Sequence, residues 1–246
     1  MSRFFTTPEQ VGEKTIRIVD KQDIQHMTKV LRLREGDRID ISDCQRWEYQ
    51  AEILEIDKEY VETLILDKQK FTSEPFTKVT LFQGLPKQGK MEVIIQKTVE
   101  LGIHEVVPLF TDRTVVTDNK GNLSKKQERW QKVADEAVKQ CKRGLIPRIG
   151  EALKFQQLLP LLDTFDLVLF PYENEEQRNI KTALRGLDQK PETVALIIGP
   201  EGGFSDREAE LLKGTRAHCV TLGKTTLRTE TAGMAALAMV MYELEL

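Results

Sequence analysis

The chain of 246 residues contains few of the side chains that bind metals or form covalent links. Its cysteines and histidines are widely separated: Cys44, Cys141, Cys219, His26, His104 and His218. They form no CxxC, HExxH or HxH pattern, and an odd, dispersed set of cysteines is typical of reduced thiols. We therefore expect neither a disulfide framework nor a protein-bound metal. Because Cys141 and Cys219 have apolar neighbours, we expect both to be packing residues.

Long hydrophobic runs are also absent. The longest strongly apolar stretch, residues 232–242, is too short to span a bilayer. Residues 1–8 lack the apolar core and the small-residue cleavage site of a signal peptide. Hydrophobic residues make up 40% of the chain and charged residues 30%, which is ordinary for a globular protein. We therefore expect a cytoplasmic protein without a membrane segment.

Neither sign of charge dominates the sequence. The formal net charge is −3, with 12 Lys and Arg against 15 Asp and Glu in residues 1–70 and 24 of each in the remainder. This balance excludes a protein that binds nucleic acid through a globally basic surface. A local basic patch remains compatible with it.

The first seventy residues are rich in β-strand patterns. Short alternating segments at 15–19, 38–42, 47–56 and 60–66 predict strands joined by tight turns. A helix capped by Asp20 interrupts them, and its expected apolar face consists of Ile24, Met27, Val30 and Leu31. These features predict a small β-barrel.

A polar segment at residues 68–77 contains Pro75 and breaks this pattern, so we place a domain boundary at residue 70. Strands then alternate with helices, with strands at 79–82, 105–110, 167–170 and 194–198 and helices at 91–101 and 124–141, the latter capped by Ser124. The nearly continuous apolar strands are typical of a parallel sheet covered on both faces. The apolar residues 232–241 predict a buried helix, packed within the chain or against a second copy.

A glycine-rich loop, Gly-Pro-Glu-Gly-Gly, follows the strand at 194–198 and precedes a capping box that begins at Ser205. Ligands of open α/β sheets bind beyond the carboxyl ends of the strands, and glycines there let the backbone approach a ligand. A phosphate-binding loop requires positive charge, whereas this loop carries Glu201, and the chain has no GxxxxGK or GxGxxG motif. The loop therefore favours a ligand without phosphate that carries positive charge. A plain tight turn is the alternative.

A second loop, residues 222–230, follows the expected strand at 218–222. Its Arg228 precedes the last helix, which Thr229 or Thr231 can cap. Two roles for Arg228 remain open: an ion pair with Glu201 or Glu230, or contact with an anion or carbonyl of a substrate. Two loops that close together at one sheet edge predict a small-molecule pocket.

Together the two loops resemble those of the SPOUT class of RNA methyltransferases, through Gly-Pro-Glu-Gly-Gly followed by Leu-Gly-x-x-x-Leu-Arg-Thr-Glu-Thr-Ala. More narrowly, the chain is similar to the bacterial family that methylates N3 of a uridine in 16S ribosomal RNA. Segments 26–32, 87–92, 96–102 and 129–132 agree with that family, so the resemblance covers essentially the whole chain. One departure is Cys44, which stands where the family usually has glycine.

The resemblance implies a PUA-like β-barrel over residues 1–70 and an α/β domain with a trefoil knot over residues 71–246. It implies a homodimer and S-adenosylmethionine as the cofactor. The residues expected to bind the cofactor are Leu196, Ile198, Gly199, Pro200, Glu201, Gly202, Gly203, Leu222, Gly223, Leu227, Thr229 and Ala232. Arg228 is the residue expected to stabilise charge on the uracil. Glu230 and Glu201 are candidate bases, although water is an alternative.

The implied substrate is 16S ribosomal RNA, free or in the 30S subunit. Residues 124–148 hold eight Lys and Arg against three Asp and Glu, which is either a solvated helix face or an RNA contact. The candidate RNA-binding residues are Arg3, His26, Arg32, Lys87, Lys90, Lys97, Lys139 and Arg143. Phe4 and Phe5 offer rings for stacking on bases or for packing on the barrel. Alternative functions are ribose 2′-O methylation and RNA binding without catalysis.

Overall fold

The computed structural model describes residues 3–71, 74–116 and 122–245. The chain forms two compact units. One contains the residues up to Glu74 together with Val138–Ile146, and the other contains Pro75–Ala137 and the residues from Pro147 onwards.

The first unit contains a five-stranded sheet with the order β1-β3-β4-β5-β2. Its strands are β1 (Arg3–Phe5), β2 (Thr15–Ile18), β3 (Arg38–Ser42), β4 (Trp47–Ile56) and β5 (Val61–Lys70). β1 runs parallel to β3, and the other pairs are antiparallel. Alternate residues of the strands form a core that includes Phe4, so this ring packs in the interior and does not offer a stacking surface.

The helix between β2 and β3 departs from the expected pattern at its end. As predicted, Asp20 caps α1 (Lys21–Gln25) by accepting the N–H groups of Gln22 and Asp23. The chain then widens into a π-helical turn, His26–Val30. The wider turn breaks the 3.6-residue period. The expectation that Val30 lies on the apolar face is therefore wrong, because its exposed fraction is 68%.

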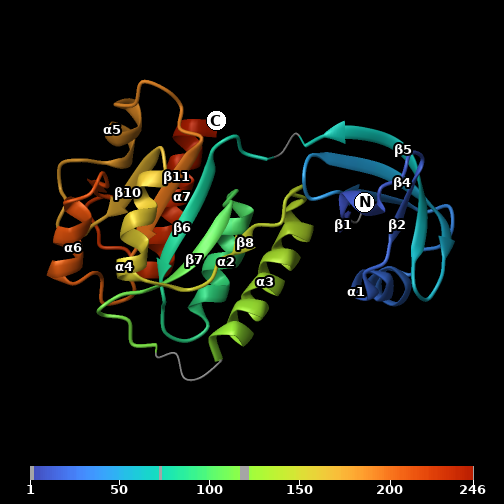
Figure 1. Cartoon of the computed structure of the whole chain (residues 1–246), viewed down its shortest axis with the longest axis horizontal. Coiled ribbons are helices and arrows are strands. Elements are labelled where there is room, and N and C mark those ends of the chain that lie inside the picture. Colours follow the sequence, from blue (N-terminus) through green and yellow to red (C-terminus); the bar gives the residue numbers. More distant parts are fainter. Residues whose placement is uncertain (1–2, 72–73, 117–121, 246) are drawn as a thin grey trace. The chain divides into compact units, whose positions relative to one another are not determined.

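Strand β5 continues to Lys70, four residues beyond the end expected at residue 66. Its last part pairs with the beginning of β4, which places Lys68 opposite Tyr49 and Lys70 opposite Trp47. The polar side chains do not prevent strand formation here, since one strand supplies the other with backbone hydrogen bonds. Part of the polar segment expected to break the strand pattern is thus the end of a β-ribbon (Figure 1).

The segment Val138–Ile146 joins the first unit although it follows most of helix α3. Its Gly144 passes so close to Phe71 that an added Cβ would lie 2.6 Å from the ring. The hydroxyl of Ser42 donates to the Gly144 carbonyl, and buried Arg143 forms an ion pair with Glu74 at 2.8 Å. The returning segment therefore packs against the residues that follow β5 and stabilises them.

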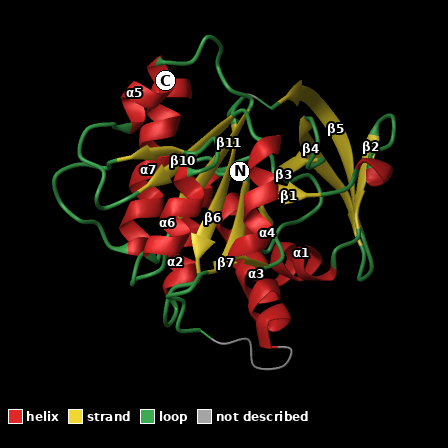
Figure 2. Ribbon diagram, turned by 60° about the vertical axis from the view of Figure 1, so that its left-hand side comes forward, coloured by secondary structure: helices red, strands yellow, loops and turns green. Residues whose placement is uncertain are grey.

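The second unit contains a seven-stranded parallel sheet with the order β12-β10-β11-β6-β7-β8, and β9 also pairs with β7. Its strands are β6 (Lys78–Gly84), β7 (Glu105–Phe110), β8 (Arg148–Ile149), β9 (Leu153–Lys154), β10 (Leu167–Pro171), β11 (Thr193–Ile198) and β12 (His218–Val220). The predicted α/β class with a parallel sheet is confirmed (Figure 2).

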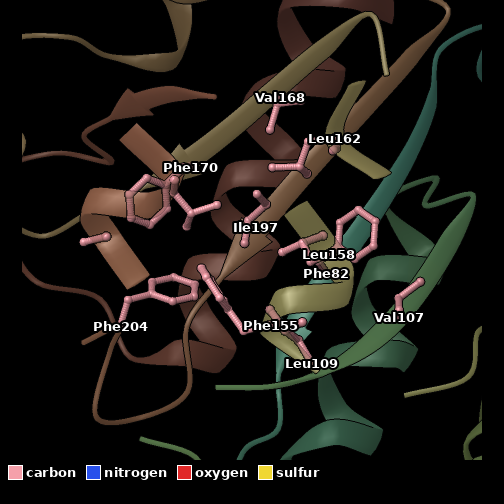
Figure 3. Packing of buried hydrophobic residues seen from close by; sticks show 13 residues of the cluster. Phe82, Val107, Leu109, Phe155, Leu158, Leu162, Val168, Phe170, Ile197 and Phe204 are labelled. Atoms are coloured by element: carbon pink, nitrogen blue, oxygen red, sulfur yellow. The ribbon is translucent and has the colours of Figure 1, made fainter. Parts of the chain in front are cut away.

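Helices cover both faces of this sheet. They are α2 (Lys90–Glu100), α3 (Asn122–Cys141), α4 (Phe155–Leu158), α5 (Ile180–Arg185), α6 (Asp206–Lys213) and α7 (Thr229–Glu245). On one face, Phe155 of α4 and Leu212 of α6 pack with Phe82, Phe170 and Ile197 of the strands (Figure 3). Helix α7 packs against β6 and β11 and also against α2 and α5.

The helix ends show which local signals the sequence carries. Ser205 caps α6 with the predicted capping box. Gly102 follows α2 with a φ of +93°, a conformation that favours glycine. The prediction that Ser124 caps α3 is wrong, since that helix begins at Asn122.

Helix α7 is not covered on all sides within the described part of the chain. Ala236, Leu237 and Val240 are buried, whereas the exposed fractions of Met239 and Tyr242 are 39% and 67%. No helix in the described ranges is long and apolar enough to cross a membrane.

Candidate functional site

A pocket of about 400 Å³ lies where three neighbouring parallel strands end. Its walls are residues 171–173 at the end of β10, residues 198–201 with Gly203 and Phe204 at the end of β11, and residues 221–229 after β12. Lys90 and Ala232 complete the lining. The strands lie side by side in the order β12-β10-β11, so their loops meet at one edge of the sheet. The volume suits a small molecule or cofactor.

Glycines allow the walls to come close together. Gly203 and Gly223 have φ values of +67° and +128°, which side chains rarely adopt. At the end of β6, a Cβ added to Gly84 would lie 2.4 Å from the nitrogen of Pro200. The first loop therefore rests directly on the backbone of β6.

Thr229 fastens the second loop to the first. Its buried hydroxyl donates to the carbonyl of Gly199 at 2.6 Å and accepts a hydrogen bond from the Gln83 side chain at 2.9 Å. Thr229 is the first residue of α7, and these bonds use its side chain differently from the predicted helix cap. The two loops are thus joined at the base of the pocket.

Lys90, at the start of α2, brings together the two acidic residues of the loops. Its Nζ lies 3.0 Å from Glu201 Oε1 and 3.5 Å from Glu230 Oε2, and the Lys87 backbone N–H also donates to Glu201. The hydrogen bond with Glu201 raises the pKa of Lys90. Partial burial raises the pKa of Glu201, but the hydrogen bonds from Lys90 and from backbone N–H groups hold it below its ordinary value.

Arg228 lines the pocket and is exposed. Among the ion pairs of the described residues, none includes Arg228, so the partner of Glu201 and Glu230 is Lys90 and not this arginine. Of the two roles left open by the sequence, the geometry favours contact with a ligand. The guanidinium is available to a planar, oxygen-bearing group in the pocket.

The outer side of the first loop is held by the turn after β7. Glu208 is fully buried, and its carboxylate accepts the backbone N–H groups of Asp112 at 2.8 Å and Ser205 at 3.0 Å. Arg113 donates to the carbonyl of Gly202 at 2.8 Å. A buried carboxylate with two N–H partners is satisfied, and it fixes the start of α6 next to the pocket.

Ten of the twelve residues predicted to bind a cofactor line the pocket. Leu196 does not, because it is buried within β11 before the strand ends, and Gly202 faces Arg113 instead. The third wall, Pro171, Tyr172 and Glu173, was not predicted from the sequence, although it follows the predicted strand at 167–170. The rule that ligands bind beyond strand ends could have identified it.

Comparison with known proteins agrees with this architecture. Residues 72–241 match the model of an RNA methyltransferase domain, and residues 19–66 match that of an RNA methyltransferase PUA domain. The chain is 34% identical to ribosomal RNA small subunit methyltransferase E of Bacillus subtilis (strain 168), over 100% of this chain and 98% of that protein.

The chain belongs to the ribosomal RNA small subunit methyltransferase E family. The family assignment agrees with the resemblance found in the sequence, and the first unit contains the PUA domain.

Two solved relatives contain S-adenosylmethionine. One, from Legionella pneumophila, is described as a methyltransferase; it is 30% identical with a TM-score of 0.82, and the match covers 98% of this chain and 97% of that one. The other is a methyltransferase E from Neisseria gonorrhoeae, 26% identical with a TM-score of 0.84, and the match covers 99% of this chain and 98% of that one.

Three of the candidate RNA-binding residues form ion pairs inside the first unit. Arg143 is 6% exposed and pairs with Glu74, so it supports the fold and does not offer its charge to RNA; this prediction needs correction. Arg3, whose side chain is 11% exposed, pairs with Glu48 at 2.7 Å. Lys139 pairs with Asp23 at 2.9 Å.

The other candidates are more accessible. Arg32 and Lys87 are exposed, and half-buried Lys97 pairs with Glu100 of its own helix. His26 is half-buried, and its ring meets that of Phe4 edge-on. Lys90 lies at the pocket. Among the described residues, no group of three or more His, Cys, Asp and Glu side chains is arranged to hold a metal ion.

Proposed function

We propose that this protein transfers the methyl group of S-adenosylmethionine to N3 of a uridine in 16S ribosomal RNA. The observation that carries the proposal is the pocket of about 400 Å³ formed by the loops after β10, β11 and β12. Relatives named ribosomal RNA small subunit methyltransferase E, two of them matching at least 98% of this chain, support the substrate class.

The residues of the pocket fit this cofactor. Ile198, Leu222 and Leu227 supply apolar surface for a planar base and for the carbon chain on the sulfonium, and the loops supply backbone groups for hydrogen bonding. A Cβ added to Gly223 would meet nothing within 4 Å, so open space lies beside the backbone there. When bound, S-adenosylmethionine supplies an electrophilic methyl group on a sulfonium.

The protein must prepare the uracil for this methyl group. N3 lies on the Watson–Crick edge and carries a proton, so the base must be unpaired and the proton must leave. Arg228 stabilises the negative charge that develops on the uracil, and the ammonium of Lys90 adds a second positive charge at the pocket. Holding the nucleotide in place supplies the remaining advantage.

Of the two acidic residues, we assign Glu230 as the proton acceptor. The pKa of Glu201 is lowered, which weakens it as a base, and its oxygens accept hydrogen bonds from Lys87 and Lys90. Glu230 Oε2 is buried and has no hydrogen-bond partner among the described residues, although it lies 3.5 Å from Lys90. Protonation of this oxygen would give up its ion pair with Lys90.

The proposal includes a trefoil knot and a homodimer. In its support, the chain passes from β11 across β10 to β12 and then returns to α7 beside β11, where Thr229 bonds to Gly199. The exposed Met239 and Tyr242 on α7 provide apolar surface for a second copy.

The decisive experiment is nucleoside mass spectrometry of 16S ribosomal RNA after incubation with the protein and S-adenosylmethionine. We expect N3-methyluridine and no 2′-O-methyluridine. The reverse result would identify a ribose methyltransferase of the same class. Calorimetry with S-adenosylmethionine complements this test, because absence of binding at millimolar cofactor would indicate an RNA-binding protein without catalysis.

A further inference from the structure

We propose that Arg46, Trp47, Lys68 and Lys70 form a contact surface for single-stranded RNA on the first unit. This group of residues, the Trp47 surface, lies where β4 begins and β5 ends. Figure 1 shows the ribbon that these two strands form. The inference rests on the proposed function for the identity of its ligand, which is an RNA strand. Its site is separate from the cofactor pocket, all of whose lining residues belong to the second unit.

The strand register gathers these residues. Trp47 pairs with Lys70, and Tyr49 pairs with Lys68, so these paired side chains point to the same face of the ribbon. Arg46 lies in the bend before β4 and reaches the Trp47 ring from there. Lys68 Nζ lies 4.4 Å from the centre of the Trp47 ring, Arg46 Cζ lies 5.5 Å from it, and Lys70 Nζ lies 6.0 Å from it. One indole thus has three cations around it.

The three cations have no acidic partner of their own. Among the ion pairs of the described residues, none includes Arg46, Lys68 or Lys70, whereas Arg3 and Lys139 of the same unit are paired. Like charges this close repel one another. A polyanion bound at the surface would relieve that repulsion.

Of the acidic residues close to this surface in the sequence, Glu48 and Asp43 are engaged in other contacts. Exposed Asp67 directly precedes Lys68 in the strand and therefore points to the opposite face of the ribbon. Glu48 points to the opposite face of the ribbon, because it neighbours Trp47 in the strand, and it pairs with Arg3. Asp43 is buried, and its carboxylate accepts the backbone N–H groups of Gln45, Arg46 and Trp47. The positive charge of the surface is therefore available to a ligand.

The combination of a partly buried ring and exposed cations suits a nucleotide strand better than an acidic peptide. Trp47 is half-buried and packs against the core of the unit, so its ring is held in place. The three cations are exposed and have long side chains that can follow a phosphate backbone. Single-stranded RNA is bound by this combination of stacking rings and positive charge.

The first test replaces the three cations together, as Arg46→Ala, Lys68→Ala and Lys70→Ala in the full chain. The probe is a single-stranded RNA of 12 nucleotides, titrated at several salt concentrations. We expect affinity at low salt to fall roughly 10- to 100-fold and the slope of log K against log salt to fall by about 2, as for three lost phosphate contacts.

The matched control removes equal charge from the same unit, as Lys14→Ala, Lys21→Ala and Lys58→Ala. These three lysines are exposed and lie outside the Trp47 surface. The control should bind the RNA within about 2-fold of the parent. Equal losses in both triple variants, or no loss in the first, would overturn the proposal.

The second test reports on the ring itself. The chain has two tryptophans, and Trp130 is buried, so the Trp130→Phe variant leaves Trp47 as the only indole. The RNA should quench its fluorescence, and an abasic strand of equal length should quench it far less. Polyglutamate tests the alternative ligand. If it binds as tightly as RNA, and its affinity falls equally in the variant that lacks Arg46, Lys68 and Lys70, the surface binds an acidic protein and the RNA assignment is overturned.

Calorimetry with S-adenosylmethionine separates this inference from the proposed function. Both triple variants should keep the parent's cofactor affinity. If the parent fails to bind the cofactor, the proposed function fails while the RNA titrations still decide the role of the Trp47 surface. If cofactor binding is normal and the RNA titrations show no loss, only the Trp47 surface is refuted.

Discussion

Within the described part of the chain, Lys90 is the one positive charge that pairs with both acidic residues of the pocket, at 3.0 Å from Glu201 and 3.5 Å from Glu230. Its raised pKa keeps it protonated throughout the neutral range, so it cannot serve as the base. In the proposed reaction it acts on the uracil by its charge. A nearby cation lowers the pKa of an acid such as uracil N3, and its removal raises that pKa.

We predict that Lys90→Gln lowers kcat roughly 10- to 100-fold at pH 7, as for a lost electrostatic contact. Because the pKa of uracil N3 is then higher, the rate of the variant should recover as pH rises from 7 to 9. The parent, whose Lys90 stays charged over that range, should change less. Single-turnover rates across this pH range measure the effect, and parallel pH profiles would contradict an electrostatic role.

Arg228 is expected to touch the substrate and not the loops. We predict that Arg228→Ala lowers kcat by about 10²- to 10³-fold, the usual loss when a donor to a developing oxyanion is removed. Arg228→Lys should regain part of the rate, since it keeps the charge but loses the planar fork. The affinity for S-adenosylmethionine, measured by calorimetry, should stay within about 3-fold. If the Arg228→Ala variant methylates RNA at the parent rate, Arg228 does not stabilise the charge on the uracil.

At this scale the sequence predicted most of the pocket because both loops have strong local signals. Glycines at 199, 202, 203 and 223 mark turns, and Arg228 sits between a strand and a helix. It could not show that Lys90, more than 100 residues away, is the partner of both acids. The choice between Lys90 and Arg228 depends on which loop packs against which, and local pattern carries no such information.

At the scale of elements, the close approach of β6 to the first loop depends on Gly84. An added Cβ would lie 2.4 Å from the nitrogen of Pro200, and backbone atoms on both sides leave no flexible group to move. We predict that Gly84→Ala costs about 1–3 kcal/mol of unfolding free energy, as for overpacking in a core. It should also weaken cofactor binding, because the loop that it displaces lines the pocket.

The matched control is Gly89→Ala, where the added Cβ would meet only the Glu92 carboxylate, at 3.6 Å. Chemical denaturation and calorimetry should show little change for this variant. If Gly84→Ala unfolds like the control and binds the cofactor normally, the two loops do not depend on this contact.

Elements were predicted well wherever burial sets the period. The strand at 105–110 has the predicted ends, and Cys44, at a site where the resemblance has glycine, has a φ of +57° that explains the preference for glycine. Errors arose where local sequence is polar or irregular. The π-helical turn at His26–Val30 exposed Val30, and backbone pairing with β4 extended β5 to Lys70. Both depend on tertiary partners, which periodicity does not reveal.

For the whole chain, the least predictable feature is the return of Val138–Ile146 to the first unit. It depends on contacts across 69 to 102 positions of sequence, such as Arg143 with Glu74 and Ser42 with Gly144. The basic composition of this region suggested an RNA contact. Pairing with distant acids, visible only in three dimensions, gives part of that charge a structural role.

The exposed face of α7 carries the last prediction, which concerns assembly. Met239 and Tyr242 border a mainly apolar pocket of about 300 Å³, whose other walls include Leu222 and Gly223 of the second loop. A second copy packed there would bury this apolar surface and steady the loop that also lines the cofactor pocket. We therefore expect the protein to be a homodimer through this face, with cofactor affinity linked to assembly.

Tyr242→Arg should convert the dimer to a monomer at micromolar protein, because it places an unpaired charge in the proposed interface. Sedimentation equilibrium measures the change, and calorimetry should show weaker binding of S-adenosylmethionine by the monomer. Leu211→Arg is the matched control, since Leu211 is 41% exposed on α6, away from this pocket. A parent protein that is monomeric, or a Tyr242→Arg variant that remains dimeric, would place the interface elsewhere. Because the second loop contributes to both pockets, a dimer that dissociates without any change in cofactor affinity would show that the loop does not transmit assembly to the site.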